Sequence, residues 1–264
     1  MSGPSERIGE IQPRAMDQIV GIIPARYGST RFPGKPLADV GGKSMIRRVY
    51  EQAKRSRSLQ RVVVATDDER IREHVRSFGG EAVLTPVEIP SGTDRCWAAL
   101  GRIGGAFRYV VNIQGDEPFI DPSQIDQLAS VLNDGKTEIA TLIIPVGRQE
   151  LLFDPGEAKV VVNAEMEALY FSRSVIPFVH GEPPERWVTS HRFYRQVGMY
   201  AYRTDILGRI TTLPVSPLEQ AESLEQLRWL ENGFRIRCVE TAFESHCIDK
   251  PEDVERILRQ MNLS

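Results

Sequence analysis

Residues 19–37 read IVGIIPARYGSTRFPGKPL, and this stretch decides the fold. Its first five residues are apolar and mostly β-branched, which predicts a buried strand over Ile19–Ile23. The strand runs directly into a loop with two glycines, two hydroxyl side chains and three cationic side chains. Such a loop after a first strand can direct backbone N–H groups and positive charge at a polyphosphate. The stretch therefore predicts an anion-binding loop.

The loop does not follow the two best-known phosphate-binding patterns. It matches neither GxGxxG nor GxxxxGK[ST], so the sequence supports neither a dinucleotide-binding Rossmann site nor a P-loop. Judged by composition alone, a basic surface loop with turn-forming Pro and Gly remains the alternative interpretation.

Further apolar runs predict buried strands at Arg61–Ala65, Tyr109–Ile113 and Ile139–Ile144. Stretches with helical periodicity lie between the strands, at Ser44–Arg55, Asp68–Phe78, Thr93–Gly104 and Pro122–Leu132. This alternation predicts βαβ units with right-handed crossovers, and hence an α/β fold with a mostly parallel sheet that helices cover on both faces.

The second half of the chain has a different pattern. Strand-like alternation at Ala158–Ser172 and Phe193–Tyr202 flanks a loop rich in Pro, Gly and His, which predicts a smaller β-rich insertion at about 158–203. A capping box, SPLE at 216–219, predicts a helix that runs to about Leu230. A strand over Phe234–Val239 and a helix over Pro251–Met261 would complete the chain. We expect a loose tail at 1–18 and a single domain at 19–264, rather than two independent domains.

Composition excludes several classes of protein. Hydrophobic residues make up 41% and charged residues 26% of the 264 residues, which is typical of a globular chain and not of a disordered one. The net charge of −3 provides no field for a polyanion, so nucleic acid and membrane surfaces are not expected partners. The first 18 residues lack the apolar run of a signal peptide, and a cytoplasmic location is expected. Three widely spaced cysteines, Cys96, Cys238 and Cys247, are expected to be reduced thiols.

Several motifs beyond the first loop occur in an order that is typical of one enzyme family. They are ATD at 65–67, SGTDR at 91–95, NIQGDEP at 112–118, YFSR at 170–173, SPLE at 216–219 and LEQLR at 224–228. Together with PARYGSTRFPGKPL at 24–37, they make the chain resemble the sugar-acid cytidylyltransferases, most closely the branch that uses 3-deoxy-manno-octulosonate (Kdo). The resemblance implies a Rossmann-like nucleotidyltransferase sheet and a homodimer formed through the β-rich insertion.

The resemblance also implies a reaction. The anomeric hydroxyl of a 3-deoxy-ulosonic acid would attack the α-phosphorus of CTP, giving CMP-Kdo for lipopolysaccharide biosynthesis and pyrophosphate. Such chemistry depends on in-line positioning and charge neutralisation more than on a protein nucleophile, so no catalytic base is expected. The resemblance assigns phosphate contacts to Arg26 and Lys35, with Ser29, Thr30 and Arg31 wrapping the phosphates and Gln114 as a further nucleotide contact. The expected catalytic residues are Arg26, Lys35 and Asp116.

Two aspartates are candidates for a metal site. Asp116 follows an apolar strand and so lies at a carboxyl end, where open α/β sheets bind ligands. Asp249 stands just before the last predicted helix. Two carboxylates with substrate phosphates and waters are the usual ligands of Mg²⁺. The resemblance assigns Mg²⁺ to Asp116 and Asp249, and a turn aspartate without a metal is the alternative for each.

The remaining candidates would bind the sugar acid and the base. By resemblance, Arg173 would pair with the sugar carboxylate, and Glu225 and Gln226 would bind sugar hydroxyls, unless they form an exposed polar helix face. A cytosine pocket must read N4 and O2, which calls for main-chain and short polar groups. The candidates for that role are Ser91, Thr93, Arg95, Thr66 and Asp67.

Two positions depart from the family pattern. Gln196, near the expected sugar pocket, stands where the family usually has histidine, so the identity of the sugar acid is less certain than the chemistry. Lys250 stands where the family usually has threonine, whose loss as a helix cap costs about 0.5 to 2 kcal/mol. The alternatives are a cytidylyltransferase for amino-modified Kdo or a sialic-type acid, and a silent nucleotide-binding regulatory protein. The intact Lys35, Asp116 and Asp249 argue against a silent binder.

Overall fold

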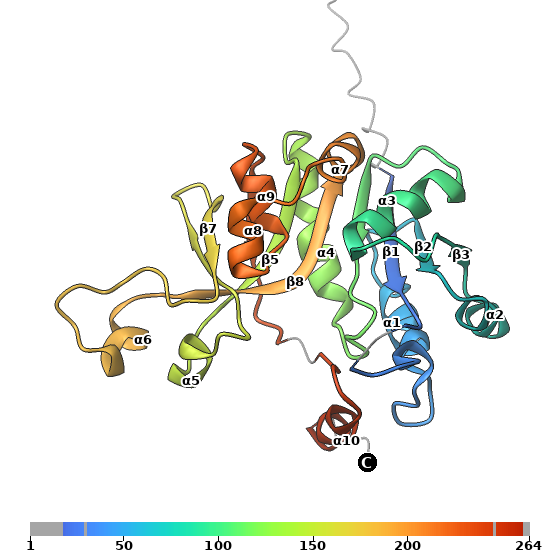
Figure 1. Cartoon of the computed structure of the whole chain (residues 1–264), viewed down its shortest axis with the longest axis horizontal. Helices are drawn as coiled ribbons and strands as arrows, with labels where there is room; N and C mark the ends of the chain where they lie inside the picture. Colours follow the sequence, from blue (N-terminus) through green and yellow to red (C-terminus); the bar gives the residue numbers. More distant parts are fainter. Residues whose placement is uncertain (1–17, 29–30, 245–246, 261–264) are drawn as a thin grey trace, which may run out of the picture.

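Nine strands form one sheet in the computed structural model, which describes residues 18–28, 31–244 and 247–260 (Figure 1). The strands are β1 Ile19–Ala25, β2 Arg61–Thr66, β3 Ala82–Leu84, β4 Tyr109–Asn112, β5 Ile139–Pro145, β6 Lys159–Val162, β7 Ala168–Ser172, β8 Tyr194–Arg203 and β9 Ile236–Glu240. Their order is β3-β2-β1-β4-β8-β5-β9, and β6 and β7 branch from β8. All the strands predicted from apolar runs are present.

The sheet is mixed, with parallel pairing at both ends. The pairs β1–β2, β1–β4, β2–β3 and β5–β9 are parallel, as the βαβ pattern predicts. Strand β8 is antiparallel to both of its central neighbours, β4 and β5. The expectation of a mostly parallel α/β sheet is therefore confirmed, with one reversed strand at its centre.

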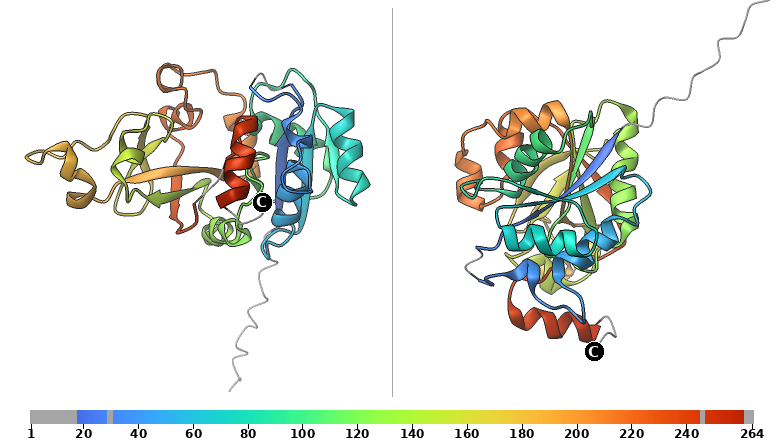
Figure 2. Two further views of the ribbon diagram at one scale, coloured as in Figure 1. Left: turned by 90° about the horizontal axis from the view of Figure 1, so that it is seen from below. Right: turned by 90° about the vertical axis from the view of Figure 1, so that its right-hand side faces the viewer.

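Helices cover both faces of this sheet. Apolar side chains of α1 Met45–Ala53, α2 Glu69–Ser77 and α4 Pro122–Ser130 pack on one face. Those of α3 Gly92–Ile103, α7 Thr204–Ile210 and α9 Gln226–Glu231 pack on the other. The right-hand view of Figure 2 shows helices on both sides of the strands. No helix among the described residues is long and apolar enough to cross a membrane.

The prediction of one continuous helix from Ser216 to Leu230 is wrong, because the structure has two helices there. Helix α8, Pro217–Glu222, starts with the predicted capping box, and α9 follows after a break. Ser223 at the break has a left-handed conformation with φ of 51°. The carbonyls of Glu222 and Ser223 accept hydrogen bonds from the Arg173 guanidinium. A side chain that directly follows β7 thus occupies carbonyls that a continuous helix would use.

The segment expected to form the β-rich insertion divides between two places. β6 and β7 form a hairpin that leaves the main sheet, together with the short helices α5 Gln149–Phe153 and α6 Trp187–Ser190 (Figure 1). Strand β8 belongs to the centre of the main sheet and only its first residues pair with β6. Of the expected tail at 1–18, residues 1–17 lie outside the described residues.

The last helix, α10 Pro251–Gln260, lies apart from the two helical layers and packs near the first loop. Its Ile257 and the preceding Ile248 form a small buried cluster with Val40 and Met45. The backbone N–H of Ile248 donates to the carbonyl of Asp116 at 3.0 Å. These contacts place the segment before α10 beside the loop that follows β4.

Candidate active site

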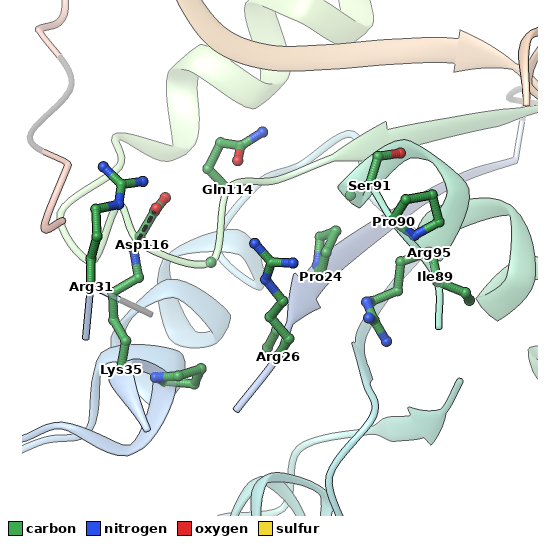
Figure 3. Close-up of a pocket in the computed structure, with 14 residues that line it drawn as sticks. Pro24, Arg26, Arg31, Lys35, Ile89, Pro90, Ser91, Arg95, Gln114 and Asp116 are labelled. Atoms are coloured by element: carbon green, nitrogen blue, oxygen red, sulfur yellow. Dashed lines mark hydrogen bonds and ion pairs between the residues drawn. The ribbon is translucent and has the colours of Figure 1, made fainter. Parts of the chain in front are cut away.

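A cleft opens at the carboxyl ends of β1 and β4 and at the start of α3. Its lining includes Arg26, Arg31, Lys35, Ser91, Gln114 and Asp116. In Figure 3, Arg31, Lys35 and Asp116 lie at one end of the cleft and Ser91 and Arg95 at the other, with Arg26 between them. The first end therefore carries several accessible charges, whereas at the second end the charge of Arg95 is buried and paired with Asp67.

The first loop is bent back on itself by backbone contacts. The N–H of Gly34 donates to the carbonyl of Tyr27 at 3.0 Å, and Gly34 has a φ of 70°, which favours glycine. The Arg70 guanidinium lies over the Tyr27 ring, 3.5 Å from the ring centre. The backbone N–H of Tyr27 donates to Asp67 Oδ1 at 3.3 Å. Arg26 and Arg31 on this loop are exposed, whereas Ser29 and Thr30 lie outside the described residues.

Gly115 allows the β4 loop to approach β1. A Cβ atom at this position would lie 2.6 Å from the carbonyl oxygen of Pro24, closer than real Cβ contacts allow. A side chain here would therefore push the two loops apart. Glycine at this position brings the next residue, Asp116, beside the first loop.

Lys35 joins three segments of the chain at the charged end of the cleft. Its ammonium group lies 2.8 Å from Asp116 Oδ2 and 3.6 Å from Asp249 Oδ1, and donates to the Ile248 carbonyl at 3.0 Å. Arg31 Nη1 lies 3.0 Å from Asp249 Oδ2. The two predicted metal ligands thus converge, and two cations of the first loop balance their charge.

The donor set fits a divalent cation. One ligand atom from each of Asp116, Cys247 and Asp249 lies within 4.8 Å of the others. Carboxylate oxygens are the ligands that Mg²⁺ prefers. The Asp253 carboxylate accepts hydrogen bonds from the backbone N–H groups of Asp249 and Lys250. It thus satisfies N–H groups at the start of α10, a role that the family's threonine at position 250 would have as a helix cap. The backbone of Asp249 is therefore held in place although position 250 is a lysine.

Of the five cytosine candidates, Ser91 and Arg95 line the cleft. Ser91 caps α3, because its Oγ accepts the N–H of Asp94. Arg95 is 3% exposed and pairs with Asp67 at 3.2 Å; burial lowers the pKa of its guanidinium. The structure uses the other three candidates, Thr66, Asp67 and Thr93, in internal contacts.

Thr66 and Thr93 illustrate these internal contacts. Thr66 is fully buried, and its carbonyl accepts both the N–H and the hydroxyl of Thr85. The Thr93 hydroxyl donates to Glu225 Oε2 at 2.8 Å. Neither side chain is among the groups that line the cleft, so direct contact between these two residues and cytosine stays a prediction.

Two of the four sugar candidates, Gln196 and Gln226, form connected hydrogen bonds between α9 and the sheet, and a third, Glu225, makes a separate contact with α3. Gln226 Nε2 donates to Gln196 Oε1 at 2.8 Å, and Gln196 Nε2 donates to the hydroxyls of Thr141, at 3.1 Å, and Tyr200. Glu225 accepts from Thr93 at the start of α3, and burial raises the pKa of its carboxyl group. Nearby, Gln114 of the cleft donates to the carbonyl of Gly198 at 2.6 Å. Gln196 and Gln226 are therefore linked to the cleft through β8, and Glu225 is linked to it through α3.

Arg173, the fourth sugar candidate, is occupied elsewhere. Its guanidinium donates to the backbone carbonyls of Glu222 at 2.7 Å, Pro155 at 2.9 Å and Ser223 at 3.3 Å. It does not line the cleft described above. Its role toward a sugar carboxylate stays a prediction, and in this structure it fixes the break between α8 and α9.

Three groups at or near the site lie outside the motifs that point to it in the sequence. Thr141 and Tyr200 hold Gln196, and their only signal was the strand that carries each of them. Cys247 was interpreted as one of three unpaired thiols; all three are free, but Cys247 lies with the two aspartates. Cys247 stands two residues before Asp249, and this short spacing is the feature of the sequence that places the thiol near the proposed metal ligand.

Comparison with known proteins assigns the family. The cytidylyltransferase family model matches residues 20–255. A 3-deoxy-manno-octulosonate cytidylyltransferase of Parabacteroides distasonis is 53% identical over 247 residues, which cover 92% of this chain and 98% of the relative. The enzyme of the same name from Bacteroides thetaiotaomicron is 52% identical over 90% of this chain and 96% of its own length.

A solved structure agrees with these relatives. The chain superposes on a CMP:2-keto-3-deoxy-manno-octonic acid synthetase complexed with CTP with a TM-score of 0.86 and 40% sequence identity. The match covers 93% of this chain and 98% of that one. The similarity therefore extends over nearly the full length of both proteins and includes the segments that form the cleft.

Proposed function

This chain belongs to the cytidylyltransferase family, and from that premise we propose that it transfers CMP from CTP to 3-deoxy-manno-octulosonate. The products are CMP-Kdo, an activated sugar for lipopolysaccharide biosynthesis, and pyrophosphate. Relatives of that name match the chain over more than 90% of its length. The observation that carries the proposal is the contact of Lys35, on the first loop, with Asp116, after β4, at 2.8 Å.

The charged end of the cleft suits a triphosphate. Arg26, Arg31 and Lys35 put three positive charges on one loop, and the lysine is a compact charge while the arginines can contact phosphate oxygens bidentately. Ser29 and Thr30 are proposed to complete the wrapping of the phosphates. Lys35 and Arg26 hold the α-phosphorus in line with the attacking hydroxyl and balance the charge on the leaving pyrophosphate.

Asp116 and Asp249 are the proposed ligands of Mg²⁺. Both carboxylates already face one cation, the Lys35 ammonium. This shared orientation supports the proposal that they also bind Mg²⁺ together when CTP binds. Bound there, Mg²⁺ would neutralise phosphate charge and orient the triphosphate. The Asp253 carboxylate keeps Asp249 in place by accepting two backbone N–H groups.

The end of the cleft at Ser91 is proposed to hold the nucleoside. Ser91 offers a polar group there, Arg95 closes the wall from a buried position, and Gln114 offers a further polar group toward the charged end. Asp67 and Thr66 support this wall through Arg95 and the segment around Thr85. Thr93 acts through Glu225 rather than through an exposed hydroxyl.

The sugar acid is proposed to lie along β8, beside Gln114. Gln196 and Gln226 share one set of hydrogen bonds at this place, and Glu225 is held separately by Thr93, so a sugar hydroxyl that contacts one of them meets a fixed partner. Arg173 remains the proposed partner of the carboxylate; to reach it, the guanidinium would exchange the carbonyl contacts that now hold it. The amides of Gln196 and Gln226 do not ionise, unlike the histidine usual at position 196, which gains a proton near neutrality.

We also propose a homodimer that uses a projecting arm, which consists of the β6–β7 hairpin and the short helices α5 and α6 (Figure 1). Three apolar side chains on or beside the arm are exposed: Phe178 at 73%, Leu169 at 61% and Phe153 at 45%. A second copy of the chain that covers them would remove this apolar surface from water.

A pyrophosphate-release assay with CTP, Mg²⁺ and a panel of sugar acids tests the proposed reaction. We expect Kdo to give the highest kcat/KM and UTP to replace CTP poorly. A higher value for an amino-modified or sialic-type acid would favour the second candidate, to which Gln196 points. Binding of CTP without pyrophosphate release from any sugar acid would contradict the enzymatic assignment.

A further inference from the structure

Carboxylate and thiol side chains meet beside Lys35, and the thiol, that of Cys247, has no part in the proposed reaction. Asp116 and Asp249 offer hard carboxylate oxygens, whereas Cys247 offers sulfur, and their ligand atoms lie within 4.8 Å of one another. Carboxylates suit Mg²⁺, while thiolates favour softer cations such as Zn²⁺ and Cd²⁺. The cluster therefore has donors for two classes of metal.

A positive charge already lies against this cluster. The Lys35 ammonium contacts Asp116 Oδ2 at 2.8 Å, Asp249 Oδ1 at 3.6 Å and the Ile248 carbonyl at 3.0 Å. Oxygen atoms from two distant segments thus converge on one cation, independently of the cysteine. A metal that displaces the ammonium group would meet the same oxygens.

Spacing and access suit a metal ion. Two ligand atoms on one tetrahedral zinc ion, at Zn–S of about 2.3 Å and Zn–O of about 2.2 Å, lie about 3.7 Å apart. The three ligand atoms now lie within 4.8 Å of one another, so they would have to approach by about 1 Å at most, which side-chain rotation can supply. Cys247 is exposed, so aqueous metal can reach it, whereas Cys96 and Cys238 are buried at 0% and 3% exposure.

We propose that Asp116, Cys247 and Asp249 form a second metal-binding mode, in which a thiophilic divalent cation of the zinc class takes the position assigned to Mg²⁺ and gains Cys247 as an added ligand. A water or a phosphate oxygen completes a four-coordinate site. The inference rests on the proposed function only in assigning Mg²⁺ to this position. Occupied by the softer ion, the site excludes Mg²⁺, so the cluster makes the enzyme sensitive to zinc.

Cadmium is the probe for the binding step, because a cadmium–thiolate bond gives an ultraviolet charge-transfer absorption. Cd²⁺ is titrated into the full chain without CTP or sugar acid. We expect a saturable band at one Cd²⁺ per chain, lost in Cys247→Ser and kept in Cys238→Ala, the matched control for a buried thiol. Asp116→Asn and Asp249→Asn should each weaken Cd²⁺ binding at least about tenfold, the lower range for disturbing a metal's ligand environment.

Two results would overturn the proposal. A band of equal strength in Cys247→Ser would assign the metal to another thiol. A Cd²⁺ affinity that is unchanged in both aspartate variants would make Cys247 a surface thiol that binds metal alone.

A second measurement separates this inference from the proposed function. At limiting Mg²⁺, the Zn²⁺ concentration that halves pyrophosphate release should rise at least about tenfold in Cys247→Ser relative to wild type. Turnover without a cadmium band in wild type overturns the metal inference and leaves the function standing. A cadmium band that requires all three ligands, in a protein that turns over no sugar acid, supports the metal inference and contradicts the function.

Discussion

The Lys35 ammonium lies 2.8 Å from Oδ2 of Asp116, although the two residues belong to different loops at the end of the sheet. Their side chains are 16% and 24% exposed, so water screens the pair less than it would a surface ion pair. The contact links the cationic loop after β1 with the carboxylate after β4. A ligand that carries both phosphate and a divalent cation would replace this pair by two new ones, phosphate with Lys35 and metal with Asp116.

Replacing Lys35 with alanine tests the phosphate assignment. We expect Lys35→Ala to lower kcat/KM for CTP by about two orders of magnitude, since it removes a positioned charge from the cleft. The exposed Lys54 is the control, and Lys54→Ala should leave the kinetics with CTP unchanged. Unchanged kinetics in Lys35→Ala would remove this residue from the site.

Replacing Asp116 with asparagine tests the metal assignment. Asp116→Asn keeps the shape of the side chain but removes one negative charge from a site for a hard cation. Turnover should fall at least about 100-fold, because several kcal/mol of charge stabilisation are lost, and added Mg²⁺ should restore it only in part. Asp39→Asn, at an exposed aspartate, is the control. Full wild-type turnover after removal of divalent metals with a chelator would contradict the mechanism.

Replacing Gln196 with histidine tests the sugar assignment. The glutamine amide accepts from Gln226 and donates to Thr141 and Tyr200, a set of contacts that a single imidazole cannot reproduce. Gln196→His should therefore change the ranking of Kdo against amino-modified and sialic-type acids in kcat/KM, with little effect on the KM for CTP. An unchanged ranking would place Gln196 outside the sugar pocket.

Removing Asp67 tests the support of the cleft wall. Asp67→Ala leaves the Arg95 guanidinium, 3% exposed, without its ion-pair partner. Breaking a buried pair from one side is costly, so the free energy of unfolding should fall by about 3 kcal/mol, measured by urea denaturation. The exposed pair of Glu255 and Arg259 gives the control, because Glu255→Ala should change stability by less than about 1 kcal/mol. If the two variants lose the same free energy of unfolding, the buried pair of Asp67 and Arg95 stabilises the protein no more than an exposed ion pair, and the prediction is wrong.

Local patterns in the sequence predicted most of the fold. The apolar runs at Ile19–Ile23 and Arg61–Ala65 became β1 and β2, and the predicted capping box at 216–219 forms at the start of α8. These features depend on neighbours a few residues apart, so periodicity and capping residues suffice to find them. The order of the motifs predicted the family, which the comparisons confirm.

Motifs in the sequence show which chemical groups are present: cations on the first loop, Asp116 after a strand and Asp249 before the last helix. Which of these groups meet depends on how distant segments pack together. Packing of Ile257 and Ile248 against Val40 and Met45 brings Cys247 and Asp249 to Asp116, and no local pattern encodes a contact between such distant segments. The same holds for Arg173, whose donors go to carbonyls at the helix break instead of the cleft, because hydrogen-bond partners are fixed by packing across the whole chain.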